Sequence, residues 1–380
     1  MRVAFFQRIF ARYQAGLVKE LAASSVHSYG FFGGDQDPLA SGIEPLDRLL
    51  IDELPYTVCR TVHWGPHCAF QWRSVWCALT GVYDVLILEG GASIVTNWLA
   101  IIIARIRNKR VLLYTHGWLR VERGLKKIVK NAFYRLADGL LLYGKRGRDF
   151  GIASGFDPRR LYVVYNSLDD EPICRQRRAL SAAACDEFIR TWFGAAHVGC
   201  PLVVSVGRLN TIKEYPLLLE ACAILNRERG IDLSLMLAGD GPERAVLEEQ
   251  ARELDVRLVM AGARYDEEFL GLMIAAASMM VIPGAAGLSV IHSLSYGTPV
   301  VVHDDDDAQG PEAEAVMEGV NGAHFSRGDA ADLARAMLTV LSDLPKTHAV
   351  RECCRQVVDQ AYSPGRMREA FDQAVSGYPA

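Results

Sequence analysis

Residues 282–301 of the 380-residue chain, IPGAAGLSVIHSLSYGTPVV, indicate the fold most directly. An apolar run ends at Ile282, a loop of small residues and a helical segment follow, and Gly297 precedes a second apolar run. Strands that alternate with helices in this way build parallel α/β sheets. The small residues of the loop leave room for a ligand beside the start of the helix, where free backbone N–H groups favour phosphate.

The same alternation extends over the whole chain. In the first half we expect strands at residues 3–6, 28–32, 58–62, 84–88, 111–115, 139–143 and 161–165. In the second half we expect them at residues 202–206, 233–238, 257–260, 279–282 and 299–303. Because a single core rarely serves 380 residues, we predict two α/β domains, at residues 1–175 and 190–360.

Charge is divided unevenly between the two halves. Residues 1–170 carry 22 Lys and Arg against 15 Asp and Glu, a net charge of +7, whereas the remainder carries −11. The basic first half favours an anionic surface or substrate. Nucleic acid is disfavoured as a partner because the sequence contains no recognisable nucleic-acid-binding module.

The nine cysteines are odd in number, irregularly spaced and form no CxxC motif. This pattern favours a reducing compartment and argues against a zinc site. The apolar start of the chain is too short for a signal peptide, and the apolar stretch 98–104 is too short to span a bilayer. We therefore expect a cytoplasmic protein and interpret residues 98–104 as part of a buried helix.

Two cations follow the expected strand at residues 202–206. In the segment SVGRLNTIKE (205–214), Gly207 ends the strand, and Arg208 and Lys213 lie five residues apart. Ligands of open parallel sheets bind beyond the carboxyl ends of the strands. The planar guanidinium of Arg and the compact ammonium of Lys suit a diphosphate there, although two solvated surface cations would give the same pattern.

A glycine turn follows the next expected strand. In LAGDGPE (237–243), Gly239 and Gly241 permit a close backbone approach or a positive φ. On its own this signal is weak, because most such turns are only turns. His292, in the helical segment of 282–301, is by itself more often a structural residue, but its place near the start of that helix favours a role in binding.

These three segments, in this order, resemble glycosyltransferase family 4, a group of retaining enzymes with the GT-B fold. The resemblance covers most of residues 201–342, including GRLN…K, LAGDGPER, MAGARYDEEFLGLM, AAASMMVIP, GLSVIHSLSYGTPVV and EAVMEGVNG. It implies two Rossmann-like domains whose parallel sheets face a cleft, the first for the acceptor and the second for the nucleotide sugar. It also implies a C-terminal helix, here residues 364–380, that crosses back to the first domain.

The resemblance assigns donor-binding roles in the second domain. It implies that Arg208 and Lys213 hold the donor diphosphate. The turns around it would be formed by three glycines, Gly207, Gly239 and Gly241.

Further roles fall on the loop of residues 282–301 and on the first domain. The resemblance implies that Gly287, Leu288 and Ser289 present backbone amides to the phosphates or the donor sugar. It also implies that Glu314, in EAVMEGVNG, lies near the donor nucleotide or loop. In the first half, YTHGW (114–118) is similar to the strand-end segment whose histidine, here His116, points at the donor sugar.

One departure from the family pattern concerns its acidic residues. Most members carry two glutamates eight residues apart around the helix of residues 282–301. Aligned without gaps, these positions are Gly284 and His292 here, and the PGxxGLxxxHSLxxG pattern marks a variant subgroup. His292 can hydrogen-bond a ribose hydroxyl, but Gly284 offers no carboxylate. We expect Glu312 to supply it, so that Glu312→Gln reduces turnover well beyond its effect on folding.

The resemblance implies retaining transfer of a sugar from a nucleotide-diphosphate donor to a glycan or lipid-linked acceptor, in bacterial surface polysaccharide synthesis. No covalent nucleophile stands out. We expect no cofactor and no metal, because the aspartate run 304–307 is more typical of a solvated loop. Two alternatives stay open: a non-catalytic nucleotide-sugar-binding partner of another transferase, and a GT-B epimerase or phosphorylase. A phosphorylase would be expected to carry a pyridoxal-phosphate lysine and a longer chain.

Residues 125–137, LKKIVKNAFYRLA, mix cations and apolar residues at helical spacing and follow further cations at positions 105, 107, 109 and 110. Such a helix can rest on an anionic membrane face that presents a lipid-linked acceptor. A core-facing helix with a solvated outer side gives the same pattern. We place acceptor specificity near residues 8–14 and 33–37, and donor specificity near residues 263–266 and 284–289.

Overall fold

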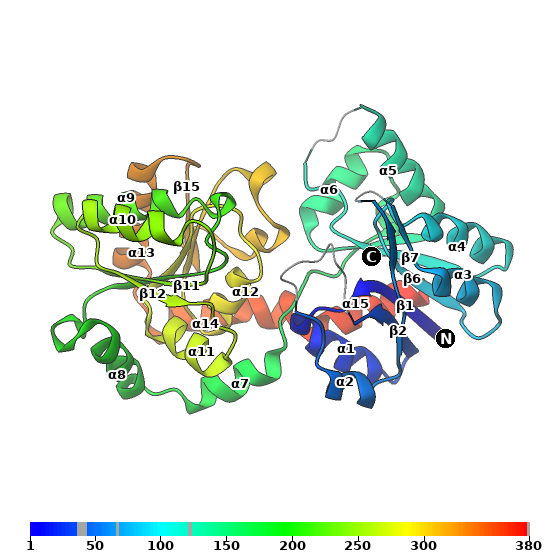
Figure 1. Cartoon of the computed structure of the whole chain (residues 1–380), viewed down its shortest axis with the longest axis horizontal. Coiled ribbons are helices and arrows are strands. Elements are labelled where there is room, and N and C mark those ends of the chain that lie inside the picture. Colours follow the sequence, from blue (N-terminus) through cyan, green and yellow to red (C-terminus); the bar gives the residue numbers. More distant parts are fainter. Residues whose placement is uncertain (36–43, 66–67, 121–123, 378–380) are drawn as a thin grey trace. The chain divides into compact units, whose positions relative to one another are not determined.

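The computed structural model describes residues 1–35, 44–65, 68–120 and 124–377. The chain divides into two compact units (Figure 1). The first unit is Met1–Asp169 together with Tyr362–Ala380, and the second is Asp170–Ala361. The first unit therefore ends six residues earlier than the domain predicted at 1–175.

The first unit contains a parallel sheet of seven strands in the order β3-β2-β1-β6-β7-β8-β9. Its strands are β1 (Arg2–Ile9), β2 (Ser28–Gly34), β3 (Tyr56–Val58), β6 (Val85–Glu89), β7 (Arg110–Thr115), β8 (Gly139–Leu142) and β9 (Leu161–Val163). Nearly continuous apolar runs such as VLILE and VLLYT suit strands that are covered on both faces. The strand expected at residues 58–62 is wrong, because β3 ends at Val58 and β4 (Val62–Trp64) begins a small antiparallel pair with β5 (Cys68–Phe70).

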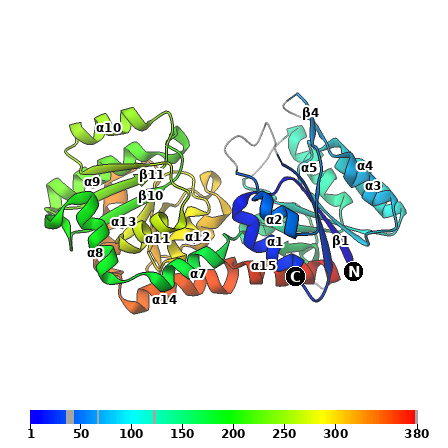
Figure 2. The same cartoon turned by 60° about the horizontal axis from the view of Figure 1, so that its bottom comes forward.

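Helices cover both faces of this sheet. One face carries α1 (Ala15–Ala22), α2 (Arg48–Glu53) and α15 (Pro364–Ser376) (Figure 2). The other carries α3 (Trp72–Leu79), α4 (Val95–Ile106) and α5 (Gly124–Leu136), with α6 (Lys145–Ala153) beside them (Figure 1). Among the described residues no helix is both long enough and apolar enough to cross a lipid bilayer.

The second unit contains a parallel sheet of six strands in the order β12-β11-β10-β13-β14-β15. Its strands are β10 (Leu202–Val206), β11 (Ser234–Ala238), β12 (Leu258–Gly262), β13 (Met279–Ile282), β14 (Val300–His303) and β15 (Gly322–Phe325). Its helices are α7 (Asp170–Ala179), α8 (Ala182–Phe193), α9 (Tyr215–Arg229), α10 (Arg244–Glu253), α11 (Glu267–Ala276), α12 (Ser289–Ser295), α13 (Ala330–Asp343) and α14 (His348–Val357). All the strands expected here are present, and β15 is one that the sequence did not indicate.

The last helix belongs to the first unit, as predicted. Helix α15 packs on α1 and inserts Phe371 beside Phe5, with ring centroids 5.6 Å apart. Its Asp372 accepts a hydrogen bond from the Tyr29 hydroxyl at 2.8 Å. The chain thus returns to the sheet where it began; residues 378–380 of the predicted helix lie outside the described residues.

The interpretation of residues 98–104 as a buried helix is only half right. They lie in α4, whose inner side is buried. Leu99 and Ile102 on the same helix are 42% and 48% exposed. The apolar residues of this segment therefore lie on both sides of the helix: some pack in the core and others are exposed.

Candidate active site

The loops that follow β10 and β11 touch each other through their backbones. A Cβ atom at Gly239 would lie 1.8 Å from the carbonyl oxygen of Gly207, and one at Gly241 would lie 2.3 Å from that of Leu209. The Leu209 N–H donates to the Asp240 carbonyl at 3.0 Å. Of the two possibilities left open by the sequence, close backbone approach is therefore the one observed, and the approach is to a neighbouring loop.

Lys213 points into these loops. It ends the turn Thr211–Lys213 and is half-buried, and its Cε lies 3.4 Å from the position of a Cβ on Gly207. Its Nζ donates to the carbonyl of Ala285 at 2.5 Å, in the loop after β13. Burial lowers the pKa of the Lys213 ammonium, and the charge of Glu312 opposes this effect. Lys213 thus holds a positive charge between three strand-end segments.

The loop after β13 explains the missing glutamate. A Cβ at Gly284 would lie 2.1 Å from the carbonyl oxygen of Ile212, and the Ala285 N–H donates to the same oxygen at 3.1 Å. No side chain fits at position 284, so the carboxylate that a gapless alignment places there has no room. Gly287 differs, because a Cβ there would have no atom within 4 Å. The open side of this loop is therefore at Gly287.

A buried carboxylate lies behind this loop. Glu312 is 6% exposed and belongs to the turn Pro311–Ala315. The turn is fixed to the loop because Gln309 accepts from the Ala286 N–H at 2.8 Å, and a Cβ at Gly310 would lie 2.4 Å from the Ala286 carbonyl oxygen. Its charge acts on Lys213, so the structure brings together these two groups, which are 99 positions apart.

Four other predicted residues stand at the same edge of the sheet. Arg208 directly follows Gly207 and is exposed. Leu288 and Ser289, at the start of α12, are half-buried, as is Glu314 in the turn that carries Glu312. Their contacts with a donor stay predictions.

His292 is tied into a buried polar trio. Its Nε2 lies 2.8 Å from Glu267 Oε1, and the Tyr296 hydroxyl donates to the same oxygen at 2.5 Å. Burial works against ionisation of Glu267, but the hydrogen bonds from His292 and Tyr296 outweigh it and lower the pKa of this carboxyl. The predicted ribose contact would have to use the other ring nitrogen. The sequence did not point to Glu267, whose only signal is its place after Asp266 in the first turn of α11.

The aspartate run at residues 304–307 lies mostly in solvent, as expected. Asp305 forms an ion pair with Arg327 at 3.0 Å, and Arg327 pairs with Glu214 at 2.6 Å. The pKa of Asp305 is lowered, first of all by its hydrogen bond with Arg327. In the described part of the chain these aspartates are not among the groups of three that could hold a metal.

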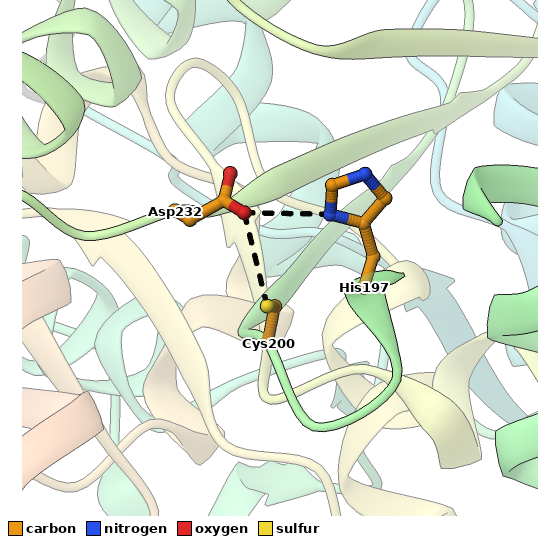
Figure 3. Close-up of side chains that lie close together, drawn as sticks. All are labelled: His197, Cys200 and Asp232. Atoms are coloured by element: carbon orange, nitrogen blue, oxygen red, sulfur yellow. Dashed lines mark hydrogen bonds and ion pairs between the residues drawn. The ribbon is translucent and has the colours of Figure 1, made fainter. Parts of the chain in front are cut away.

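One group of three that could hold a metal is present elsewhere in the described ranges: His197, Cys200 and Asp232 (Figure 3). His197 Nδ1 lies 3.4 Å and Cys200 Sγ 3.9 Å from Asp232 Oδ2. The sequence did not indicate this group, because an HxxC segment meets an aspartate that is distant in the chain. The guanidinium of Arg257 lies 2.6 Å from Asp232 Oδ1 and lowers the pKa of that carboxyl, so the cluster already contains a cation.

His116 lines a cavity in the first unit. The cavity, of about 270 Å³, opens at the carboxyl ends of β1, β6 and β7 and is also lined by several residues of the predicted acceptor segment 8–14. At its wall Arg8 forms an ion pair with Glu89 at 2.8 Å, a carboxylate that the sequence did not single out. The other predicted acceptor segment, 33–37, lies partly outside the described residues.

His116 is exposed as a residue, but its ring packs against an aromatic side chain. Its ring lies 4.2 Å from that of Tyr143, centroid to centroid. Desolvation, and then the charge of Lys130, lower the pKa of His116. The imidazole is therefore neutral at pH 7.

Residues 194–357 match the family model "Glycosyl transferases group 1". Among curated proteins, a glycogen synthase of Halorhodospira halophila is 30% identical over 243 residues, which cover 60% of this chain and 48% of that protein. A GDP-mannose-dependent alpha-(1-6)-phosphatidylinositol dimannoside mannosyltransferase of Mycobacterium tuberculosis is 31% identical over 158 residues, 41% of this chain and 39% of that one. The chain thus spans about half the length of the first of these relatives.

Solved structures show the same fold along the whole chain. The crystal structure of Anabaena Alr3699/HepE in complex with UDP has a TM-score of 0.74 at 18% identity and covers 99% of this chain and 100% of that one. The lipopolysaccharide outer core galactosyltransferase WaaB has a TM-score of 0.68 at 16% identity, with 99% of both chains covered. The chain therefore has the predicted GT-B fold.

The group 1 match coincides with the strand-end loops of the second unit. It includes Lys213, Gly287 and Glu312, and it excludes His116. The family-model match therefore lies within the second unit, and the first unit is outside it.

Proposed function

We propose that the protein is a retaining glycosyltransferase that moves a sugar from a nucleotide-diphosphate donor to a glycan or lipid-linked acceptor, in surface polysaccharide synthesis. The observation that carries the proposal is the half-buried Lys213, which lies beside Gly207 and Glu312 and binds the Ala285 carbonyl, in the part of the chain that matches the group 1 model. A uridine diphosphate sugar is the proposed donor, because the structural neighbour HepE is described in complexes with UDP and UDP-glucose.

The chemistry follows from the charges of these loops. Breaking the bond between sugar and diphosphate leaves negative charge on the leaving phosphate and oxocarbenium character on the sugar. Lys213 and Arg208 would stabilise the leaving group, an electrostatic role in which one donor is typically worth about 3–4 kcal/mol. The charge of Glu312 opposes the effect of burial on the pKa of Lys213, and the open side of Gly287 gives the phosphates access to the loop backbone.

His116 has a separate role in this proposal. A neutral imidazole can donate one hydrogen bond and accept another, so it can orient a sugar hydroxyl without adding charge. Its cavity, lined by part of segment 8–14, is the proposed place of the acceptor. No metal is assigned a part, and undiminished transfer in the presence of a chelator would support this.

Replacement of the two cations tests the proposal. Lys213→Ala is expected to lower the rate of sugar transfer from UDP-sugars by about 100- to 1,000-fold, and Arg208→Ala by a comparable factor, without loss of the native fold. Arg229→Ala, at an exposed position at the carboxyl end of α9, is the control and should keep wild-type turnover. Equal rates in Lys213→Ala and wild type would refute the assignment. The anomeric configuration of the product, read by NMR, tests retention.

A non-catalytic partner is the second candidate function. It is favoured by Gly284, where no carboxylate can be accommodated. Slow hydrolysis of a UDP-sugar by the purified chain, absent in Lys213→Ala, would exclude this candidate. Donor binding without any hydrolysis or transfer would support it.

Three helices of the first unit have outer sides whose composition indicates where the acceptor is presented. On α4 four exposed residues are spaced as one stripe: Val95, Leu99, Ile102 and Ile106. The inner side of the same helix carries the buried polar residues Thr96 and Asn97. An amphipathic surface helix keeps its outer side polar, whereas α4 is largely apolar on both sides.

The neighbouring helices also expose apolar side chains on their outer sides. On α3 the exposed side carries Trp72, Trp76 and Leu79, and on α5 it carries Leu125 and Ile128. Because α3, α4 and α5 cover the same face of the seven-stranded sheet, their outer sides form one layer, here called the outer helical face (Figure 1). Exposed large apolar side chains gathered on neighbouring helices are typical of interaction sites.

Charge indicates what covers the outer helical face. None of the three helices contains Asp or Glu, and together they contain six basic residues. These are Arg73, Arg105, Lys126, Lys127, Lys130 and Arg135. Apolar residues, tryptophans and cations without acids are the composition of a surface that binds anionic lipid. We propose that this face rests on the cytoplasmic side of a membrane that presents the acceptor; co-sedimentation with anionic vesicles tests it.

A further inference from the structure

A cavity of about 660 Å³ lies in the second unit, away from the candidate donor loops. Its wall includes Pro201 and Ser278, the residues directly before β10 and β13. The donor loops follow the carboxyl ends of the same sheet, so the cavity lies at the amino-end edge. Its volume is in the range of small-molecule sites, about 300–1,000 Å³.

The charged side chains of the cavity wall are nearly all basic. Four cations line it, Arg177, Lys346, Arg351 and Arg355, and Asp186 is the one carboxylate among the lining residues described. The cations come from α7, from the segment between α13 and α14, and from α14 itself. Two of them, at positions 351 and 355, are one helical turn apart and so lie on the same side of α14.

Lys346 is held at the back of the cavity by neutral groups. Its Nζ donates to the carbonyls of Ile274, Ala275 and Ala277 at 3.1, 2.7 and 2.8 Å, at the carboxyl end of α11. Burial, followed by the charge of Arg351, lowers the pKa of this ammonium well below its usual range. The carbonyl oxygens hold this nitrogen at the back of the cavity, and the three arginines are its permanent positive charges.

Two guanidinium groups are likewise bound to carbonyls. Arg177 donates from Nη1 to the Ser295 carbonyl at 3.1 Å, and Arg351 donates from Nε to the Lys346 carbonyl at 3.3 Å. These bonds fix the arginines at the wall. They again supply no negative charge.

Arg355 lacks even this support. Its Nε is buried and has no hydrogen-bond partner in the structure. Burial, then the charges of Arg177 and Arg351, lower the pKa of its guanidinium, and Glu352 offsets only part of this. A buried polar group without a partner costs free energy, and neighbouring like charges add to the cost. A bound anion would remove both costs.

We infer that this cavity is a binding site for a small phosphate-bearing anion, separate from the donor site. Guanidinium groups present paired donors that match phosphate oxygens. The amino end of the 12-residue helix α8, at Ser181 and Ala182, also lines the cavity and adds favourable backbone dipoles. The volume accommodates an anion between a sugar phosphate and a nucleotide in size. The inference is independent of the proposed transferase activity.

The test is thermal unfolding of the full chain with increasing sodium pyrophosphate at constant ionic strength. Wild type should show a saturable rise in Tm of several degrees. Arg355→Gln and Arg351→Gln should lose most of this rise. Arg355→Gln should also have a higher Tm than wild type without pyrophosphate, because it removes a like charge from the cluster. The control Arg229→Gln, at an exposed position on α9, should respond as wild type does.

A donor-site variant separates the two phosphate sites. Lys213→Ala should keep the pyrophosphate response if the anion binds in this cavity. Loss of the response in Lys213→Ala, or an undiminished response in both Arg355→Gln and Arg351→Gln, would overturn the inference. If Arg355→Gln does not fold, the pyrophosphate-induced rise in Tm is measured in Arg351→Gln and Arg177→Gln instead, and an undiminished rise in both would overturn the inference.

Discussion

The two units of the chain bury similar sheets but expose different surfaces. Of the large apolar side chains that are exposed in the described residues, nineteen belong to the first unit and five to the second. The first unit gathers many of them on α3, α4 and α5, where no acidic residue is present. The second unit instead places its distinctive residues in loops at the ends of its strands.

This contrast shows two ways of building a binding surface on one fold. In the second unit, glycines allow loops to touch through their backbones, and the contacts fix Lys213 and Glu312 in place. In the first unit, helices that bury one apolar side in the core also expose apolar side chains on the outer side. The first arrangement is rigid and suits a small polar ligand, whereas the second offers area and suits an extended partner.

The largest effect is expected where loop contact is closest. Gly239→Ala would place a Cβ 1.8 Å from the Gly207 carbonyl oxygen, a backbone atom that cannot move aside without displacing β10. We expect the second unit to lose about 3 kcal/mol or more of unfolding free energy in urea denaturation.

Gly287→Ala is the matched control, because a Cβ there would meet no atom within 4 Å. It should change stability by less than about 0.5 kcal/mol while weakening donor binding. Equal stability of the two variants would contradict the role of close approach in this unit.

A smaller effect is expected from the charge behind Lys213. Glu312 raises the pKa of the Lys213 ammonium, against the effect of burial. Glu312→Gln removes this support, so the pKa falls and the ammonium is lost at lower pH. Turnover should drop about tenfold, and the alkaline limb of the kcat/KM profile should move to lower pH.

The control for Glu312→Gln is Glu318→Gln, a change at an exposed position six residues further along the chain. Glu318→Gln should leave the pH profile of kcat/KM unchanged. If the alkaline limb of Glu312→Gln stays at the wild-type pH, Glu312 does not control the pKa of Lys213 and this prediction is wrong.

Strand positions and the crossover helix were predictable from the sequence because parallel strands appear as uninterrupted apolar runs. In the second unit β10 and β13 have the predicted bounds. Strand β15, GAHF, was missed because two of its four residues are neither apolar nor β-branched. Short strands depend on their neighbours for stability, and this information is not local.

The candidate site was predictable only in part. Glycine motifs and the family resemblance pointed to Lys213 and Glu312. They did not indicate that Gly284 is blocked by the Ile212 carbonyl or that His292 binds Glu267, because both contacts join distant segments. The apolar stretch of α4 was interpreted as buried, since hydropathy does not tell which side of a helix faces the sheet.

The smallest effect is expected on the outer helical face. Ile106 on α4 is 75% exposed, and Leu49 on α2, which covers the opposite face of the same sheet, is 80% exposed. Ile106→Gln should weaken binding to vesicles of phosphatidylcholine and phosphatidylglycerol about threefold to tenfold, because it removes apolar area from the interface. Leu49→Gln should bind as wild type does, since that side of the unit does not touch lipid.

Salt and lipid charge sharpen this prediction. Binding should fall with added salt and be weaker on pure phosphatidylcholine vesicles, because the six cations of the face need anionic headgroups. If the chain sediments without vesicles and Ile106→Gln abolishes this, the face binds a second copy of the chain and the membrane proposal is wrong. If Ile106→Gln and Leu49→Gln bind vesicles equally, the exposed apolar side chains of the outer helical face have no part in lipid binding. The difference in exposed apolar residues between the two units must then have another cause.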